Sequence, residues 1–266
     1  MLTVDELKSA LESLKLENKP AIAHASLRSL GPIKGGSEVV LQALVDSVHA
    51  LVMPTFTYKT MILPEVGPPN NGLVYGTQRD LNRMAEPFRQ AMPVDTLMGV
   101  LPETLRRQPA VMRTSHPILS FAGVDAHEIL ITQTIFNPFA PIGALADRDG
   151  WVLLLGVNHT CNTSIHYAER LAGRHQFLRW ALTRKRIVEC PSFPGCSDGF
   201  EALRPEIEHV TRRADIGDSC IEAIPLRFLL QAVEDIIKKD PLALLCQRDV
   251  CQRCDAVRAS TRKSGS

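Results

Sequence analysis

The chain has 266 residues, of which 45% are apolar and 22% are charged. This composition is typical of a globular protein with a sizeable core, and it excludes disordered, collagen-like and fibrous classes. The 30 basic and 29 acidic residues leave a net charge of +1, so no overall field draws the chain to nucleic acid or to an anionic membrane, and neither is expected as a partner.

Hydrophobic spacing predicts helices alternating with strands over the first 60 residues. Thr3 and Glu6 form a capping box ahead of apolar residues at helical spacing. The early acids and the lack of a basic stretch before an apolar core do not fit a secretory signal. The expected elements are a helix that ends at about Leu16, a strand over 21–23, a helix over 39–48 and a strand over 51–53.

Residues 60–95 are expected to be mostly irregular. Prolines and glycines recur through this segment, at Pro64, Pro68, Pro69, Gly72, Gly76, Pro87 and Pro93. Loops longer than about 15 residues often act as lids or binding loops. A substrate is therefore expected to be held here.

The second half of the chain continues the alternation, which predicts an α/β architecture. Residues 151–157 form a continuous apolar run, as is typical of a strand buried on both faces. The other expected elements are a helix over 103–107, a strand over 120–124, a helix over 164–173 and a helix over 224–239. No linker divides the chain, so we expect a single domain over 1–266, with a cysteine-containing tail over 240–266.

The location expected from the sequence is the cytoplasm. The long uncharged stretch 129–146 is interrupted by Pro138 and Pro141, which excludes a membrane span there. The seven cysteines are an odd number scattered through a long chain, and this pattern favours reduced thiols over a disulfide framework.

His166 and Glu169 are the clearest candidates for catalysis. They follow the exit of the apolar strand over 151–157, and ligands of open α/β sheets bind outside the carboxyl ends of strands. Three residues apart, they share one helical face, so the carboxylate is able to orient an imidazole that acts as a general base. The alternative is an ordinary histidine at a helix start beside a solvated carboxylate.

A second candidate site runs from His24 to Gly36. A glycine-rich loop before a helix offers backbone N–H groups to a phosphate, and Ser26 and Ser29 could add hydroxyl donors. The segment matches neither the P-loop nor the dinucleotide fingerprint. An ordinary turn is the alternative interpretation.

A third candidate is the segment 113–121. Pro117 restricts the backbone at His116, and Ser115 and Ser120 could hydrogen-bond a ligand. Taken alone, His116 also fits the interpretation of a structurally satisfied loop histidine.

The cysteines leave two further hypotheses open. Cys161 precedes His166 by five residues and could serve as an acyl-carrying nucleophile. Cys246, Cys251 and Cys254 have iron–sulfur-like spacing without a fourth cysteine downstream. A zinc site completed by Cys220, Cys196 or a histidine competes with the interpretation as packed thiols.

Four motifs, in this order along the chain, resemble the aminoglycoside 3-N-acetyltransferase family. They are His24-Ala-Ser-Leu through Gly35-Gly36, Met53-Pro-Thr-Phe-Thr-Tyr58, Arg113-Thr-Ser-His116-Pro117 with Ser120-Phe121, and 152–157 continuing through Asn162-Thr-Ser-Ile-His166-Tyr-Ala-Glu169. The segment 65–95 and the cysteine-rich tail depart from the clinical resistance members, chiefly because the tryptophan-rich pattern is missing from 65–95.

The resemblance implies a single-domain antibiotic N-acetyltransferase-type α/β fold, with a central mixed sheet flanked by helices, and not the GCN5-type acetyltransferase fold. It also implies antibiotic resistance by transfer of acetyl from acetyl-CoA to the 3-amino group of a 2-deoxystreptamine aminoglycoside. Transfer is expected to be direct, in a ternary complex, with no metal required and no metal-ligating residues. Homodimerisation is left open.

The resemblance also implies roles for individual residues. His166 and Glu169 match the catalytic pair, and Tyr58 falls in the cleft. We expect Thr163 to stabilise the oxyanion and Asn162 to lie beside the substrate. Asp80 and Glu86 are candidate partners for a polycationic acceptor. The cofactor-binding candidates are His24, Ser26, Leu27, Ser29, Gly31, Gly35, Gly36, His116, Ser120 and Phe121.

Other functions remain open at this point. The same residues would serve an acyl-CoA N-acyltransferase that acts on another small-molecule amine. With water as the acceptor, His166 and Glu169 would serve a hydrolase. A zinc-stabilised interaction module in the tail is a further alternative.

Overall fold

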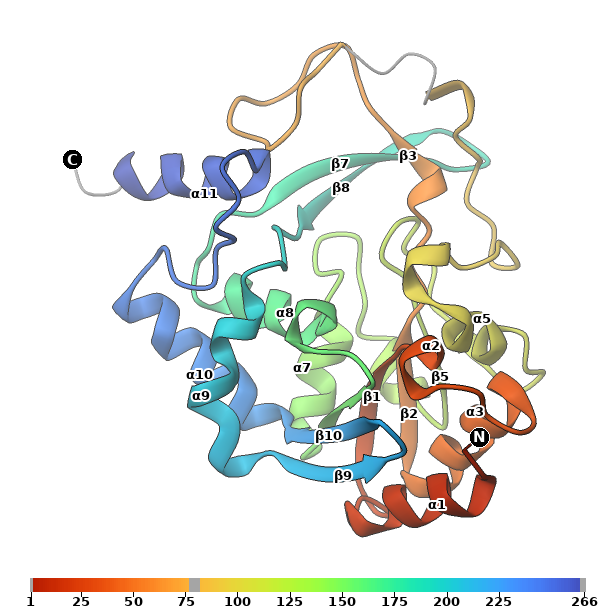
Figure 1. The fold of residues 1–266 in the computed structure, drawn as a ribbon. Coiled ribbons are helices and arrows are strands. Elements are labelled where there is room, and N and C mark those ends of the chain that lie inside the picture. The colour runs from red at the N-terminus through yellow and green to blue at the C-terminus, as the bar shows by residue number, and fades with distance from the viewer. Residues whose placement is uncertain (1, 77–81, 264–266) are drawn as a thin grey trace.

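The computed structural model describes residues 2–76 and 82–263 and has one large mixed sheet at its centre (Figure 1). The strand order is β4-β5-β2-β1-β6-β10-β9. β1 runs parallel to β2 and β6, and the other pairs are antiparallel. The strands are β1 (Pro20–Ala25), β2 (Ala50–Pro54), β4 (Met112–Arg113), β5 (Phe121–Val124), β6 (Trp151–Leu155), β9 (Arg212–Ile216) and β10 (Ser219–Pro225).

β6 contributes side chains to the cores on both faces of this sheet. Leu153 and Leu155 pack into one core, whereas Val152 and Leu154 pack into the other, and all four side chains are fully buried. Successive side chains of a strand point to opposite faces, so an interior strand covered on both sides needs a continuous apolar run. The sequence of β6 meets that requirement.

Helices cover the two faces of the sheet (Figure 1). The core that contains Leu153 is completed by α1 (Val4–Ser13), α3 (Gly36–Ser47) and α5 (Val100–Arg106). The core that contains Val152 is completed by α6 (His127–Leu130), α7 (Ala140–Asp147), α8 (Ser164–Leu171) and α10 (Leu226–Lys239). This arrangement leaves the carboxyl ends of β1, β2 and β6 at one edge of the sheet, where the connecting loops gather.

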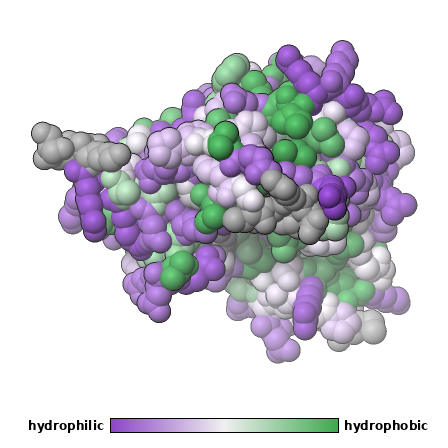
Figure 2. Space-filling model, turned by 90° about the horizontal axis from the view of Figure 1, so that it is seen from above, coloured by the Kyte–Doolittle hydropathy of each residue, from purple (hydrophilic) through white to green (hydrophobic). Residues whose placement is uncertain are grey.

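A smaller antiparallel sheet lies beyond that edge, at the top of Figure 1. Its order is β3-β7-β8, with β3 (Met61–Ile62), β7 (Phe177–Leu182) and β8 (Ile187–Phe193). Figure 2 views the molecule from this end, where apolar surface lies among polar side chains. The last helix is α11 (Gln252–Lys263).

Short helical segments complete the chain. They are α2 (Leu27–Leu30), α9 (Arg204–Ile207), and the 3₁₀ segments η1 (Tyr58–Thr60), η2 (Thr96–Met98), η3 (His159–Cys161), η4 (Phe200–Leu203) and η5 (Glu208–Val210). Among the described residues, none of the helices has the length and apolar character needed to cross a membrane.

The predicted α/β class with a mixed central sheet is confirmed, and most predicted elements are present within a few residues. The predicted start of the late helix at Ile224 was wrong, because Ile224 lies in β10, opposite Val152, and α10 begins only after Pro225. The sequence analysis missed α7, the strands from β7 to β10, and α11. Residues 61–76 and 82–95 contain little regular structure, in agreement with the prediction of an irregular segment.

His116 has a structural role in the loop between β4 and β5. Its Nδ1 accepts hydrogen bonds from the backbone N–H groups of Ile118, at 3.2 Å, and Leu119, at 2.9 Å. Burial lowers the pKa of His116 to about 4. The ring therefore stays neutral at pH 7, with Nδ1 free to accept both bonds.

This buried histidine makes stability depend on pH. Below about pH 6.5 the unfolded chain protonates this histidine and the folded chain does not, so unfolding takes up a proton and stability falls as the pH drops towards 4. We predict that His116→Asn, which keeps an acceptor but does not titrate, loses about 2 kcal/mol less stability than the parent between pH 7 and pH 5. Urea unfolding at the two pH values measures the difference. Equal losses in both proteins would contradict a buried neutral His116.

Candidate active site

A cavity of about 540 Å³ opens at the carboxyl ends of β1, β2 and β6. Its walls come from five parts of the chain and from one residue of α11. The walls consist of Ala23–Arg28, the segment from Pro54 to Tyr58, Thr96–Pro102, the loop from Val157 to His166, the loop from Phe193 to Ser197, and Arg253. Ligands of open α/β sheets bind at this edge, so the cavity is where the sequence placed the site.

His166 lines the cavity, and a buried carboxylate fixes its ring. Glu169 Oε2 lies 2.8 Å from His166 Nδ1, one turn along α8. Because Nδ1 is bound to the carboxylate, Nε2 is the ring nitrogen left for a substrate. The ring stacks on Phe139 and meets the edge of Phe200, with centroids 6.1 Å and 4.8 Å away. These contacts limit the orientations that the imidazole can adopt.

The other oxygen of Glu169 is bound to Arg174, which the sequence analysis missed. Arg174 Nη1 donates to Glu169 Oε1 at 2.8 Å, and both side chains are only 2% exposed. Arg174 Nη2 also donates to the carbonyls of Pro241 and Ala243, at 2.9 Å and 2.7 Å. The only local signal for this ion pair was that Arg174 follows Glu169 by five residues. That signal is weak, because α8 ends at Leu171 and the spacing of a helix does not bring the two side chains together.

Asn162 and Thr163 lie between the η3 turn and α8, and both line the cavity. The Asn162 side chain accepts a hydrogen bond from the Ser164 backbone N–H at 3.1 Å. Thr163 is 8% exposed, and its side chain makes no capping bond to α8. Its hydroxyl is therefore not committed to the helix that it begins.

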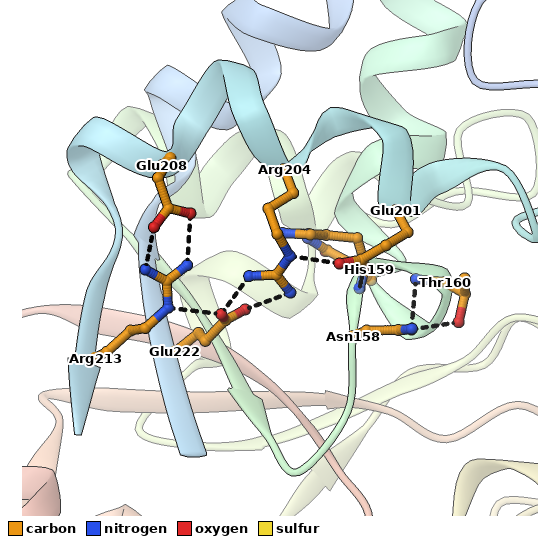
Figure 3. Close-up of polar contacts among 9 residues, drawn as sticks. Asn158, His159, Thr160, Glu201, Arg204, Glu208, Arg213 and Glu222 are labelled. Carbon is orange, nitrogen blue, oxygen red and sulfur yellow. Dashed lines mark hydrogen bonds and ion pairs between the residues drawn. The ribbon is translucent and has the colours of Figure 1, made fainter. Parts of the chain in front are cut away.

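A network of ion pairs connects the η3 turn to neighbouring parts of the fold (Figure 3). Glu201 accepts the His159 backbone N–H at 3.0 Å and also pairs with Arg204. Arg204 and Arg213 both bind Glu222, whose side chain is 9% exposed. Burial alone would raise the pKa of Glu222, but hydrogen bonds from the two arginines outweigh burial and lower it. The η3 turn is thus joined to β9, β10 and α9.

The first loop contributes His24, Ser26, Leu27 and Arg28 to the cavity. His24 is buried at the end of β1, and burial lowers its pKa to about 3. Its Nε2 has no hydrogen-bond partner within the described part of the chain. A buried polar atom at a cavity wall is normally satisfied, so a ligand group is a natural partner for it.

The other residues predicted in this loop lie outside the cavity. Ser29 donates to Ser26 Oγ at 2.9 Å and lines a shallower neighbouring groove. Gly31 and Gly35 lie between α2 and α3, and Gly36 begins α3; all three are exposed and have positive φ angles of 78°, 90° and 65°. Their position supports a turn, which was the alternative interpretation.

His116, Ser120 and Phe121 were predicted to bind the cofactor, but they are not among the residues that line the cavity. Ser120 Oγ donates to the Thr55 carbonyl at 2.7 Å, and Phe121 is fully buried in the core. Contacts within the fold engage all three residues, although His116 Nε2 is buried without a partner among the described residues. The motif therefore shapes the segment that leads from β2 to Tyr58.

The predicted acceptor residues are divided between two cavities. Tyr58 lines the main cavity and also a second one of about 530 Å³, and burial raises its pKa to about 12. Glu86 lines only the second cavity and lies 3.8 Å from Lys59 and 3.5 Å from Arg89. Asp80 lies outside the described residues. Asp95, also on the second cavity, is the N-cap of η2.

Two further residues of the main cavity bear on its chemistry. Cys161 is exposed and lines the cavity near His166. Arg253, from the cysteine-containing tail, also lines the cavity. The sequence analysis did not predict Arg253 as a cavity residue. Its position between Cys251 and Cys254 was the available signal, because a cluster of these cysteines would fix the backbone on both sides of it.

Comparison with known proteins agrees with these observations. Residues 22–238 match the family model described as Aminoglycoside 3-N-acetyltransferase. An aminoglycoside N(3)-acetyltransferase III from Salmonella sp is 30% identical over 235 residues, which cover 76% of this chain and 79% of that protein. The aminoglycoside N(3')-acetyltransferase-like protein YokD of Bacillus subtilis is 31% identical over 63% of this chain and 64% of its own length.

The coverage of the relatives varies. The chain spans about half of aminoglycoside N(3)-acetyltransferase IV from Salmonella sp, which is 30% identical over 57% of this chain and 52% of that protein. The crystal structure of the apoenzyme of aminoglycoside acetyltransferase AAC(3)-IVa superimposes with a TM-score of 0.78 at 25% identity and covers 97% of both chains. The chain belongs to the aminoglycoside 3-N-acetyltransferase family.

Proposed function

We propose that the protein transfers acetyl from acetyl-CoA to the 3-amino group of a 2-deoxystreptamine aminoglycoside, and so confers resistance to it. The observation that supports this most is an imidazole on a cavity wall, held at Nδ1 by a buried carboxylate. Two relatives add support: a mutant of AAC(3)-IVa has been crystallised with a gentamicin, and AAC-IIIb with CoASH.

His166 acts as the general base. At neutral pH an acceptor amine is mostly ammonium, which has no lone pair, so a base must remove a proton for the nitrogen to attack. His166 Nε2 takes one ammonium proton, which frees the lone pair that bonds to the acetyl carbon. As the tetrahedral intermediate collapses, the C–S bond breaks, and the second proton of the nitrogen neutralises the departing thiolate as CoASH. Glu169 keeps the ring in the productive tautomer and stabilises the imidazolium that forms.

The end of β1 holds the acyl donor. Nε2 of His24 is the unsatisfied polar atom of this wall, and it is available to bond an amide of the pantetheine arm. Arg28 is exposed at the same wall and can bind a phosphate group of the donor. Thr163, on the His166 side, is our candidate for stabilising the oxyanion of the tetrahedral intermediate.

The acceptor lies between Tyr58 and Asn162. Burial keeps the Tyr58 phenol neutral, so it can hydrogen-bond hydroxyl and amino groups of a sugar. The second cavity, which shares Tyr58, carries the carboxylates of Glu86 and Asp95 beside the basic side chains of Lys59 and Arg179, and the two carboxylates are candidate partners for the ammonium groups of an acceptor. Acetyl-CoA is a cytoplasmic metabolite, and the free thiols fit that location.

Removal of His166 tests the base directly. We predict that His166→Ala lowers kcat by about 10²- to 10⁴-fold, because proton transfer in the transition state is lost. The affinity for acetyl-CoA, measured by calorimetry, should stay within a few-fold. His127→Ala, on the exposed surface of α6, is the matched control and should keep full turnover. Unchanged kcat in His166→Ala would contradict the assignment of His166 as the general base.

Glu169 is a positioning residue, and a pair of variants can separate its role in catalysis from its role in stability. Glu169→Gln leaves Arg174 buried without its carboxylate, which should cost about 3–5 kcal/mol of stability as well as kcat. Glu169→Gln with Arg174→Met should recover stability but not kcat, with KM for both substrates within a few-fold. Thermal melting and steady-state kinetics measure the two effects. Recovery of kcat in the double variant would show that the carboxylate acts only on the fold.

Direct transfer predicts that Cys161 does not carry the acetyl group. Cys161→Ser should keep turnover within a few-fold of the parent. Rapid quenching of the parent with acetyl-CoA alone, followed by mass spectrometry, should find no acetyl group on Cys161. An acetylated Cys161, formed and consumed at the rate of turnover, would replace direct transfer with a two-step route.

A further inference from the structure

Four cysteines from separate parts of the chain meet in one small cluster. Cys196 follows β8, Cys246 lies in the loop after α10, Cys251 directly precedes α11, and Cys254 lies in the first turn of α11. Their four Sγ atoms all lie within 4.8 Å of one another, and all four residues are buried and free of disulfides. The cluster is separate from the two cores that pack on the large sheet.

The arrangement has the ligand set of a structural zinc site. Structural Zn²⁺ binds four cysteine thiolates tetrahedrally at about 2.3 Å, which places neighbouring sulfur atoms about 3.8 Å apart. The sequence supplies a Cys-x2-Cys pair and a third cysteine at Cys246, and the fold adds Cys196 from 50 residues earlier in the chain. Of the partners considered from the sequence, Cys196 joins the group and Cys220 does not.

We propose that Cys196, Cys246, Cys251 and Cys254 bind one Zn²⁺ ion in a closed structural site. Four thiolates around Zn²⁺ carry a net charge of about −2, which needs compensation. Arg248 Nη2 lies 3.3 Å from Cys196 Sγ, and the same guanidinium pairs with Asp198. Cys251 directly precedes α11, where unpaired backbone N–H groups also favour negative charge.

The metal gives α11 a fixed position that its own apolar residues do not secure. Cys254, Ala256 and Val257 are the buried members of this 12-residue helix among those whose exposure is described. So small an apolar contact is a weak anchor, and metal ligation is a common substitute for a core in small units. Arg258 Nη2 donates to the Cys246 carbonyl at 2.8 Å, which joins the ligand loop to the helix.

The zinc site also forms one wall of the main cavity. Gly195 and Ser197 flank Cys196, and Arg253 lies between Cys251 and Cys254; all three flanking residues line the cavity. Arg253 Nη1 donates to the Gly195 carbonyl at 2.8 Å. From the irregular segment, Asn70 Nδ2 donates to the Ala256 carbonyl at 2.9 Å. The metal thus holds together three segments on the acceptor side, including a guanidinium that faces the ligand space.

Metal analysis of the purified protein tests the proposal, whatever substrate the enzyme acts on. Protein purified without chelators should contain about one zinc per chain by inductively coupled plasma mass spectrometry. Treatment with a mercurial should release it, as read by a chromogenic zinc chelator. Cys196→Ser and Cys254→Ser should lose the zinc, whereas Cys220→Ser, the matched control, should retain it. Iron in place of zinc, visible by its colour, would overturn the assignment.

A second measurement covers the case in which the serine variants do not fold. In the folded parent, the four clustered thiols should resist a thiol reagent until the zinc is removed, and zinc removal should lower the melting temperature and expose the segment after 240 to protease. A parent without metal, with the four cysteines as free, reactive thiols or as disulfides, would overturn the proposal and leave the packed-thiol interpretation. Neither result bears on His166.

Discussion

The buried carboxylate of Glu169 is the contact on which the rest of the site depends. One carboxylate oxygen of Glu169 orients His166, and the other accepts a hydrogen bond from Arg174. The side chains of Glu169 and Arg174 are both buried away from water. A buried carboxylate is costly unless it is paired and hydrogen-bonded. Arg174 therefore makes it possible for Glu169 to be buried beside the His166 imidazole, and the rings of Phe139 and Phe200 pack against that imidazole at the cavity wall.

The same ion pair also links α8 to the segment that follows α10. Through the Pro241 and Ala243 carbonyls, Arg174 fixes the segment that leads from α10 to Cys246. The cysteine cluster then fixes α11 and the loop after β8, and Arg253 extends from this unit to the cavity wall. Proximity and orientation are major sources of catalytic rate. Here the orientation of His166 and the shape of the cavity wall that carries Arg253 depend on contacts between segments that are distant in the sequence.

The sequence was most informative where a single local pattern determines the structure. A few adjacent residues were enough to predict three features: the buried strand at 151–157, the helix that begins after Thr3, and the pairing of His166 with Glu169. The parts that it did not predict depend on partners distant in the chain. Ile224 continues an apolar pattern into α10, and only its pairing with Val152 makes it a strand residue. Arg174 and Cys196 likewise acquire their roles from contacts that spacing does not reveal.

The 113–121 motif illustrates the reverse situation. A histidine and two serines beside a proline suggest ligand binding. In the fold His116 Nδ1 accepts two backbone N–H groups, Ser120 donates to the Thr55 carbonyl, and the exposed Ser115 accepts from Gln90, while His116 Nε2 has no partner among the described residues. Sequence spacing alone does not distinguish a polar group that awaits a ligand from one that the fold itself satisfies.

The central claim concerns His166 and the nitrogen that it deprotonates. The most direct test incubates the protein with acetyl-CoA and a gentamicin- or kanamycin-type compound, and locates the added acetyl group by mass spectrometry and NMR. The account predicts one acetyl group, on the 3-amino nitrogen, with CoA released only when the acceptor is present. Release of CoA at the same rate without any amine, or no acetylation of any 2-deoxystreptamine compound by folded protein that binds CoA, would contradict it.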